Sequence, residues 1–191
     1  MKYRLILAAA AALMLAAPAA HAQAGVPAPG ICVLDRDAMF STSLAGKSIG
    51  DQLRTMASAS DTALKAERAT IEKDVVGFRS LQATLPADQR QARAGDLQKR
   101  ADALDVKAAT AQREIQGGEV KALQSLLAEA SPLVDAEAAA QKCGVVLDVK
   151  AIFSFNNPPS MNLTKAVIEK LDAKIKTITV TRATTTAPAK K

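Results

Sequence analysis

The chain has 191 residues, a formal net charge of +6, only 3% aromatic residues and no tryptophan. Its single histidine, His21, lies in a segment that we expect to be removed, which excludes histidine-based catalysis and mixed His/Cys zinc sites from the mature chain. We therefore expect a protein that is not an enzyme and holds no metal and no cofactor. The mildly basic charge does not predict nucleic-acid binding.

The N-terminus has the pattern of an export signal. Lys2 and Arg4 precede an apolar run over 5–17, and Ala20-His21-Ala22 matches a small-x-small cleavage site. An uncleaved membrane anchor would need about 20 apolar residues, which this run does not supply. We predict a signal peptide over 1–22, cleavage after Ala22, and a mature exported chain with a net charge of +4.

Proline and glycine divide the rest of the chain. A Pro/Gly-rich linker occupies 23–30, and helix-forming residues without proline extend from about Leu44 to Thr84. Pro86 and Pro132 each have the character of a helix start. The predicted organisation is a body segment 31–43 with a strand at 31–34, a helical hairpin 44–131 with its turn near 85–86, a second body segment 132–180 and a disordered tail 181–191. The second body segment should hold a short helix that starts at 131–132 and ends near Lys142, with Gly144 in its C-cap region, a strand at 145–153 and a helix at 164–176.

The periodicity of the two long helices predicts a coiled coil in which the seam of the first helix is only half apolar. In the first helix, Ser60, Glu67 and Asp74 occupy positions where a rigid coiled coil would carry apolar side chains. We expect a slender, flexible hairpin. The second helix shows a continuous seam with steps of four and three residues, formed by Leu97, Ala101, Leu104, Ala108, Ala111, Ile115, Gly118 and Ala122.

Two short strands do not make a stable sheet, because about three strands with a buried face are needed. We expect the strands of several copies to build a shared body through Ile31, Val33, Val145 and Leu147. The alternative is a monomer whose last helix covers the strands. The fold class is thus mainly α, with a long antiparallel hairpin projecting from a small strand-built body.

Three segments resemble one family. They are ICVLDRDAMFSTSLAGKSIGDQL, LPADQRQARAGDLQKR and SPLVDAEAAAQKCGVVLDVKAIFSFNNPPSMNLTKAVIEKLD. In order and spacing they are similar to the Skp/OmpH family of periplasmic chaperones over residues 31–176. The resemblance implies a homotrimer with three helical tentacles that holds unfolded outer-membrane proteins without ATP. Cys32, Cys143 and the extension 177–191 depart from the family pattern.

Two functions remain open at this point. The first is a holdase chaperone, whose flexible arms bind unfolded outer-membrane proteins and prevent their aggregation. The second is a structural or adaptor coiled coil that acts as a spacer in the cell envelope. The half-polar seam favours the holdase, because a spacer gains from rigidity.

The hairpin tip and the arms carry two further candidate sites. Gly77 and Gly95 fall at nearly the same distance from the turn, which predicts a hinge, although chance or tight packing would also explain them. The tip has three more bases than acids, which predicts contact with an anionic membrane surface, lipopolysaccharide or acidic client segments; the alternative is a tip that is merely well hydrated. The tip bases are Arg79, Arg90, Arg93, Lys99 and Arg100.

The only two cysteines, Cys32 and Cys143, are 111 positions apart, near the starts of the two predicted strands. An oxidising compartment favours a disulfide, provided that the strands bring the two Cα atoms within about 4.4–6.8 Å. The alternative is a pair of buried free thiols.

Overall fold

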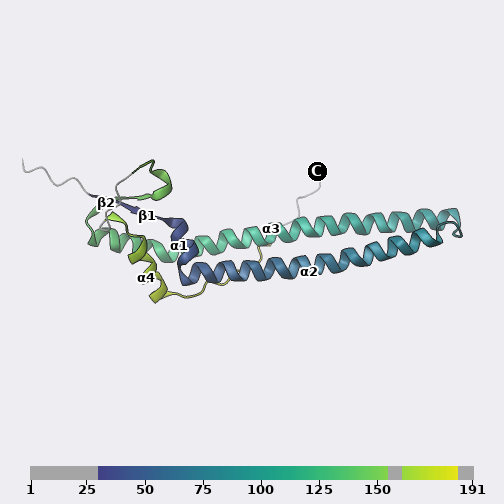
Figure 1. Ribbon diagram of the computed structural model, residues 1–191, viewed down its shortest axis with the longest axis horizontal. Coiled ribbons are helices and arrows are strands. Elements are labelled where there is room, and N and C mark those ends of the chain that lie inside the picture. The colour runs from purple at the N-terminus through teal and green to yellow at the C-terminus, as the bar shows by residue number, and fades with distance from the viewer. Residues whose placement is uncertain (1–29, 155–160, 185–191) are drawn as a thin grey trace, which may run out of the picture.

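The protein is a helical hairpin that projects from a small body at one end (Figure 1). The computed structural model describes residues 30–154 and 161–184. The predicted signal peptide and most of the linker, like residues 185–191, lie outside this part. The elements are β1 (Gly30–Leu34), α1 (Arg36–Thr42), α2 (Leu44–Leu81), α3 (Ala87–Ala140), β2 (Cys143–Asp148), the 3₁₀ turn η1 (Val149–Ala151) and α4 (Thr164–Lys174). The predicted fold class is confirmed.

Two caps determine where the first helices begin. The Asp35 carboxylate accepts a hydrogen bond from the Ala38 N–H at 2.9 Å, which starts α1 directly after β1. The Ser43 hydroxyl accepts one from the Gly46 N–H at 3.1 Å, which starts α2. We did not predict α1, which occupies the part of the body segment 31–43 that follows the strand.

Pro132 does not separate two helices, and the prediction of a helix break at 131–132 is wrong. α3 continues through it to Ala140. Proline removes one backbone hydrogen bond from the helix, but Leu126 and Ala130, just before it, are 0% and 2% exposed. Packing against the body therefore holds this part of α3 in place.

α3 ends at Ala140, close to the predicted end near Lys142, but the residue that turns the chain is Lys142 and not the predicted Gly144. Lys142 has a φ of 57°, the left-handed conformation that reverses the chain after a helix. Gly144 is part of β2, which begins at Cys143 and ends at Asp148, earlier than the predicted 145–153. η1 follows directly.

The body is built on a two-stranded parallel sheet. β1 pairs with β2 in a register that sets Ile31 beside Val145 and Val33 beside Leu147. Parallel strands require a long crossover, and here the crossover is the whole hairpin. Both ends of the hairpin are therefore anchored in the same sheet.

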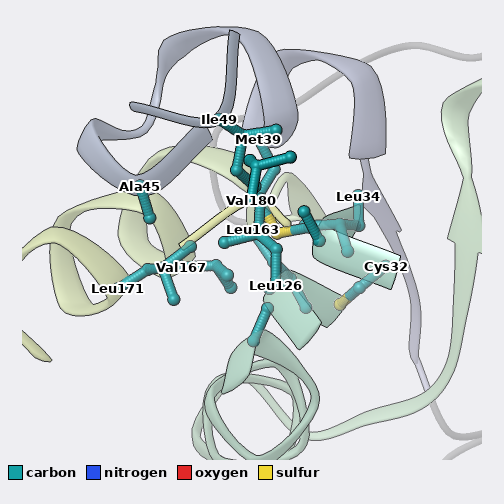
Figure 2. Packing of buried hydrophobic residues seen from close by; sticks show 12 residues of the cluster. Cys32, Leu34, Met39, Ala45, Ile49, Leu126, Leu163, Val167, Leu171 and Val180 are labelled. Carbon is teal, nitrogen blue, oxygen red and sulfur yellow. The ribbon is translucent and has the colours of Figure 1, made fainter. Parts of the chain in front are cut away.

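The core lies where α1, α4, the start of α2 and the second half of α3 meet (Figure 2). Met39, Leu126, Val167 and Leu171 are fully buried there. Leu163, just before α4, is 1% exposed. These contacts fix the base of the hairpin and leave most of its length outside the core.

The chain continues past α4 in an extended conformation and crosses the base of the hairpin (Figure 1). Val180 joins the core with 4% exposure. The tail that we predicted to be disordered from Thr181 is held at Ala183, whose N–H donates to the Glu114 carbonyl at 2.9 Å. The chain can come this close because α3 has glycines at 117 and 118.

Candidate functional site

The two arms, which are α2 and the facing part of α3, meet along a seam of small residues. Leu104, Gly118 and Ala122 are the buried residues of this α3 seam. All eight positions of the predicted α3 seam are at least partly buried, so the predicted periodicity is confirmed. The facing side of α2 is less apolar: Ile71 is buried, whereas Leu64 and Phe78, one heptad to either side, are only partly buried.

The polar positions of the α2 seam pair with charges on α3. Glu67 accepts from the Lys107 ammonium at 2.5 Å, and Asp74 accepts from the Arg100 guanidinium at 2.8 Å. The four side chains are 39–59% exposed, and exposed ion pairs contribute only about 0.2–1 kcal/mol each. The distal part of the hairpin is thus joined by weak ion pairs beside a narrow apolar seam that contains Ile71 and Leu104.

The arms leave hollows between them. One, of about 630 Å³, lies near the tip and combines apolar side chains with charges of both signs. Another, of about 460 Å³, lies nearer the body. The hollow near the tip is lined by Lys73, Asp74, Gly77, Phe78, Leu81, Ala92, Arg93, Asp96, Leu97 and Arg100.

Gly77 and Gly95 have open space where a side chain would be. A Cβ atom built on either glycine meets no atom within 4 Å. Tight packing therefore does not explain them, and of the alternatives the hinge and chance remain.

The five predicted tip bases differ in their surroundings. Arg90 donates to the Leu85 carbonyl at 2.9 Å and so helps to fold the turn, while Arg100 pairs with Asp74 across the arms. The other three form no ion pair within the described part of the chain; they are Arg79, Arg93 and Lys99.

Three of the four apolar residues predicted at a body interface are accessible. Ile31, Val145 and Leu147 are 50%, 48% and 36% exposed. Val33 is only 2% exposed, so it cannot contribute to such an interface. The segment before α4 lies along β1 and covers it, with the Leu163 N–H donating to the Val33 carbonyl at 2.9 Å.

A disulfide joins Cys32 and Cys143, whose Cα atoms are 5.7 Å apart. It closes a loop that contains the entire hairpin. Of the two alternatives left open by the sequence, the structure has the bonded one.

Ion pairs in the body tie elements together. Glu137 of α3, only 7% exposed, accepts from Lys170 of α4. This hydrogen bond, with a weaker one from Gln141, holds the pKa of Glu137 below its ordinary value. In residues 30–154 and 161–184, no group of three or more His, Cys, Asp or Glu residues could hold a metal ion, and no helix is long and apolar enough to cross a membrane.

Residues 30–171 match the family model described as outer membrane protein (OmpH-like). The chain belongs to the OmpH-like family. A solved structure of a proposed outer membrane chaperone (OmpH-like) from Caulobacter crescentus CB15 is 31% identical to it, with a TM-score of 0.75. That match covers 85% of this chain and 95% of the other. The comparison with curated proteins gives no match.

This OmpH-like chain exposes apolar residues along its arms that sequence reasoning did not identify. Val76, Val106 and Val120 are 65%, 64% and 54% exposed. Val106 and Val120 are two heptads apart and therefore lie on the same side of α3. The sequence signal that could have identified these exposed residues is an apolar side chain at a position outside the heptad seam.

Proposed function

We propose that this protein is a periplasmic holdase chaperone that binds unfolded outer-membrane proteins, without ATP, and prevents their aggregation on the way to the outer membrane. The observation that supports it best is the hairpin itself, which leaves apolar valines exposed and hollows between weakly joined arms. A self-contained spacer would bury such residues. Membership in the OmpH-like family supports the same conclusion.

An aggregation assay tests this function against the spacer alternative. A porin unfolded in denaturant is diluted into buffer with the purified mature protein, with no nucleotide present, and light scattering is followed. The holdase should keep the porin soluble at a near-stoichiometric ratio. Val106→Asp combined with Val120→Asp should weaken this protection, because charge on the exposed valines opposes apolar contact. Unchanged scattering with and without the protein would favour the spacer.

The working form that we propose is a homotrimer joined at the body. A sheet of two strands is smaller than an independent sheet needs to be, and this one leaves Ile31, Val145 and Leu147 exposed as an apolar surface for contact between copies. Native mass spectrometry should show a trimer, and Val145→Asp should shift it to monomer. Val106→Asp is the matched control, because it puts the same charge on an exposed valine outside the body. A wild-type monomer would refute the proposal.

We also propose that the tip contacts anionic surfaces such as phospholipid or lipopolysaccharide, through the three bases that lack an ion pair. Each base near a charged membrane contributes roughly 1 kcal/mol. Arg79→Glu with Arg93→Glu should abolish sedimentation with anionic vesicles at low salt. The control is Arg68→Glu with Arg113→Glu, an equal charge change in the middle of the two arms. Equal loss in both variants would point to net charge and not to the tip.

Export would bring the protein into the periplasm, which unfolded outer-membrane proteins cross. We propose that the signal peptide is cleaved after Ala22 and that the mature chain is free in the periplasm. The mass of the protein from a periplasmic extract tests this directly, because the mature chain should start at Gln23. A protein that keeps residues 1–22 and sediments with membranes would contradict the proposal.

A further inference from the structure

The segment 175–184, here called the strap, follows α4 and lies outside the residues that match the family model. It is extended and crosses the base of both arms (Figure 1). Its side chain at Val180 reaches into the core beside Leu163 and Met39 (Figure 2). The surface of the hairpin base and body that the strap covers, here called the groove, thus holds an extended segment of the chain.

The first arm binds the main chain of the strap through one side chain. The Gln52 amide nitrogen donates to the Ile178 carbonyl at 2.7 Å, and its amide oxygen accepts from the Val180 N–H at 3.0 Å. A carboxamide offers a donor and an acceptor together. Because both of its partners are backbone groups, this recognition does not depend on the side chains of the bound segment.

The second arm admits the strap through two adjacent glycines. A Cβ on Gly118 would lie 2.4 Å from the Thr181 carbonyl oxygen, and one on Gly117 would lie 2.5 Å from the Ala183 Cβ. Neither glycine has a positive φ, so the absence of a side chain, and not a special backbone conformation, is what these positions require. Glycine costs about 1 kcal/mol relative to alanine inside a helix.

Apolar and polar side chains alternate along the part of the strap that contacts the groove. Ile178 and Val180 pack on the core, whereas Thr179 and Thr181 are exposed. Further along, Arg182 donates to the Ser60 hydroxyl at 2.6 Å and lies 3.6 Å from the Glu114 carboxylate. Alternation of apolar and polar residues in an extended chain is also the pattern of membrane-spanning β-strands. Such a segment would meet the same groups in the groove.

We propose that this groove is a binding site for extended peptide segments with alternating apolar and polar residues, and that the strap is its intramolecular occupant. The ligand class rests on the proposed holdase function, since strands of unfolded outer-membrane proteins have this pattern. A tethered segment acts at an effective concentration of the order of mM. The strap therefore excludes weak single segments and is displaced by a client that binds at several places at once.

The test uses the full mature chain and a fluorescent peptide with the strap sequence IKTITVTRAT. Val180→Asp puts a charge into the core, so it should release the strap and leave the groove intact. Anisotropy should show that the peptide binds this variant at least tenfold more tightly than the wild type. Arg182→Glu, which opposes Glu114 without entering the core, should act in the same direction and serves if Val180→Asp disturbs the body.

Two second-site variants examine the groove itself. Adding Gly118→Ala to Val180→Asp should abolish peptide binding, whereas adding Gly95→Ala, where a Cβ meets open space, should leave it unchanged. Equal binding by these two double variants, or no peptide binding by either strap variant, would overturn the proposed site.

An unfolded porin should then displace the labelled peptide from the Val180→Asp variant. Failure to displace it would limit the groove to the strap and overturn the assignment to clients. Loss of protection in the aggregation assay with intact peptide binding would instead refute the holdase function and leave the groove in place. The two failures are therefore distinguishable.

Discussion

Replacing Gly77 and Gly95 with alanine should stiffen the arms. Because a Cβ at either position meets nothing within 4 Å, the substitutions add helix propensity without a clash. Each contributes about 1 kcal/mol, and together about 2 kcal/mol, or about a 30-fold smaller fraction of locally opened helix. On the hinge hypothesis, the double variant should also hold a narrower range of client sizes.

The measurement combines hydrogen exchange with the aggregation assay. Exchange in the distal parts of α2 and α3 should slow by about 30-fold, and protection of the largest porins should fall while that of small ones persists. Gly50→Ala is the matched control, since its Cβ meets only Arg54 Nη1 at 4.0 Å and it stiffens α2 near the body. If exchange slows as expected but the client range is unchanged, or if Gly50→Ala narrows the range equally, the hinge reasoning is wrong.

Three further predictions concern the links between elements. Periplasmic protein, once denatured, should titrate with no free thiol, and replacing Cys32 and Cys143 with alanine should lower the free energy of unfolding by about 2–5 kcal/mol. Folding lowers the pKa of Glu137 from its ordinary value of 4.5. The ionised carboxylate therefore stabilises the fold above pH 4.5, and this stabilisation is lost as the pH falls through the pKa of the folded state. Thermal melts should show that acid lowers the stability of Glu137→Gln less than that of the wild type. A double-mutant cycle of Asp74→Ala and Arg100→Ala should give a coupling of about 0.2–1 kcal/mol that disappears in high salt, whereas a coupling above about 2 kcal/mol would mean that the seam is not weak.

The hairpin was predictable from sequence because its signals are local. Helix-forming composition extends over 44–81, and Pro86 marks the return, so the turn is close to the predicted position. Pro132 has the same local character as Pro86, but it lies among residues buried against the body. Tertiary packing determined the outcome there, and a local rule could not distinguish the two prolines.

The body was less predictable because its contacts join distant parts of the chain. Val33 belongs to the same alternating strand as Ile31, and only the pairing of β1 with the segment before α4 shows that it is covered. α1 begins at the Asp35 cap, which follows the strand with no helical periodicity long enough to detect. The strap was missed for the same reason, since its partners Gln52 and Glu114 are far away in sequence.

The arrangement of these links divides the hairpin into two mechanical parts. Near the body, the disulfide, the core and the strap hold the arms at the level of Ser60 and Glu114. Beyond that level the arms share partly exposed ion pairs and hollows, and α2 continues for about 30 Å at ~1.5 Å per residue. Bending should therefore be confined to the distal half, where Gly77 lies. Two of the three polar seam residues, Glu67 and Asp74, lie in this distal part, where the proposed holdase function would require arms that can separate.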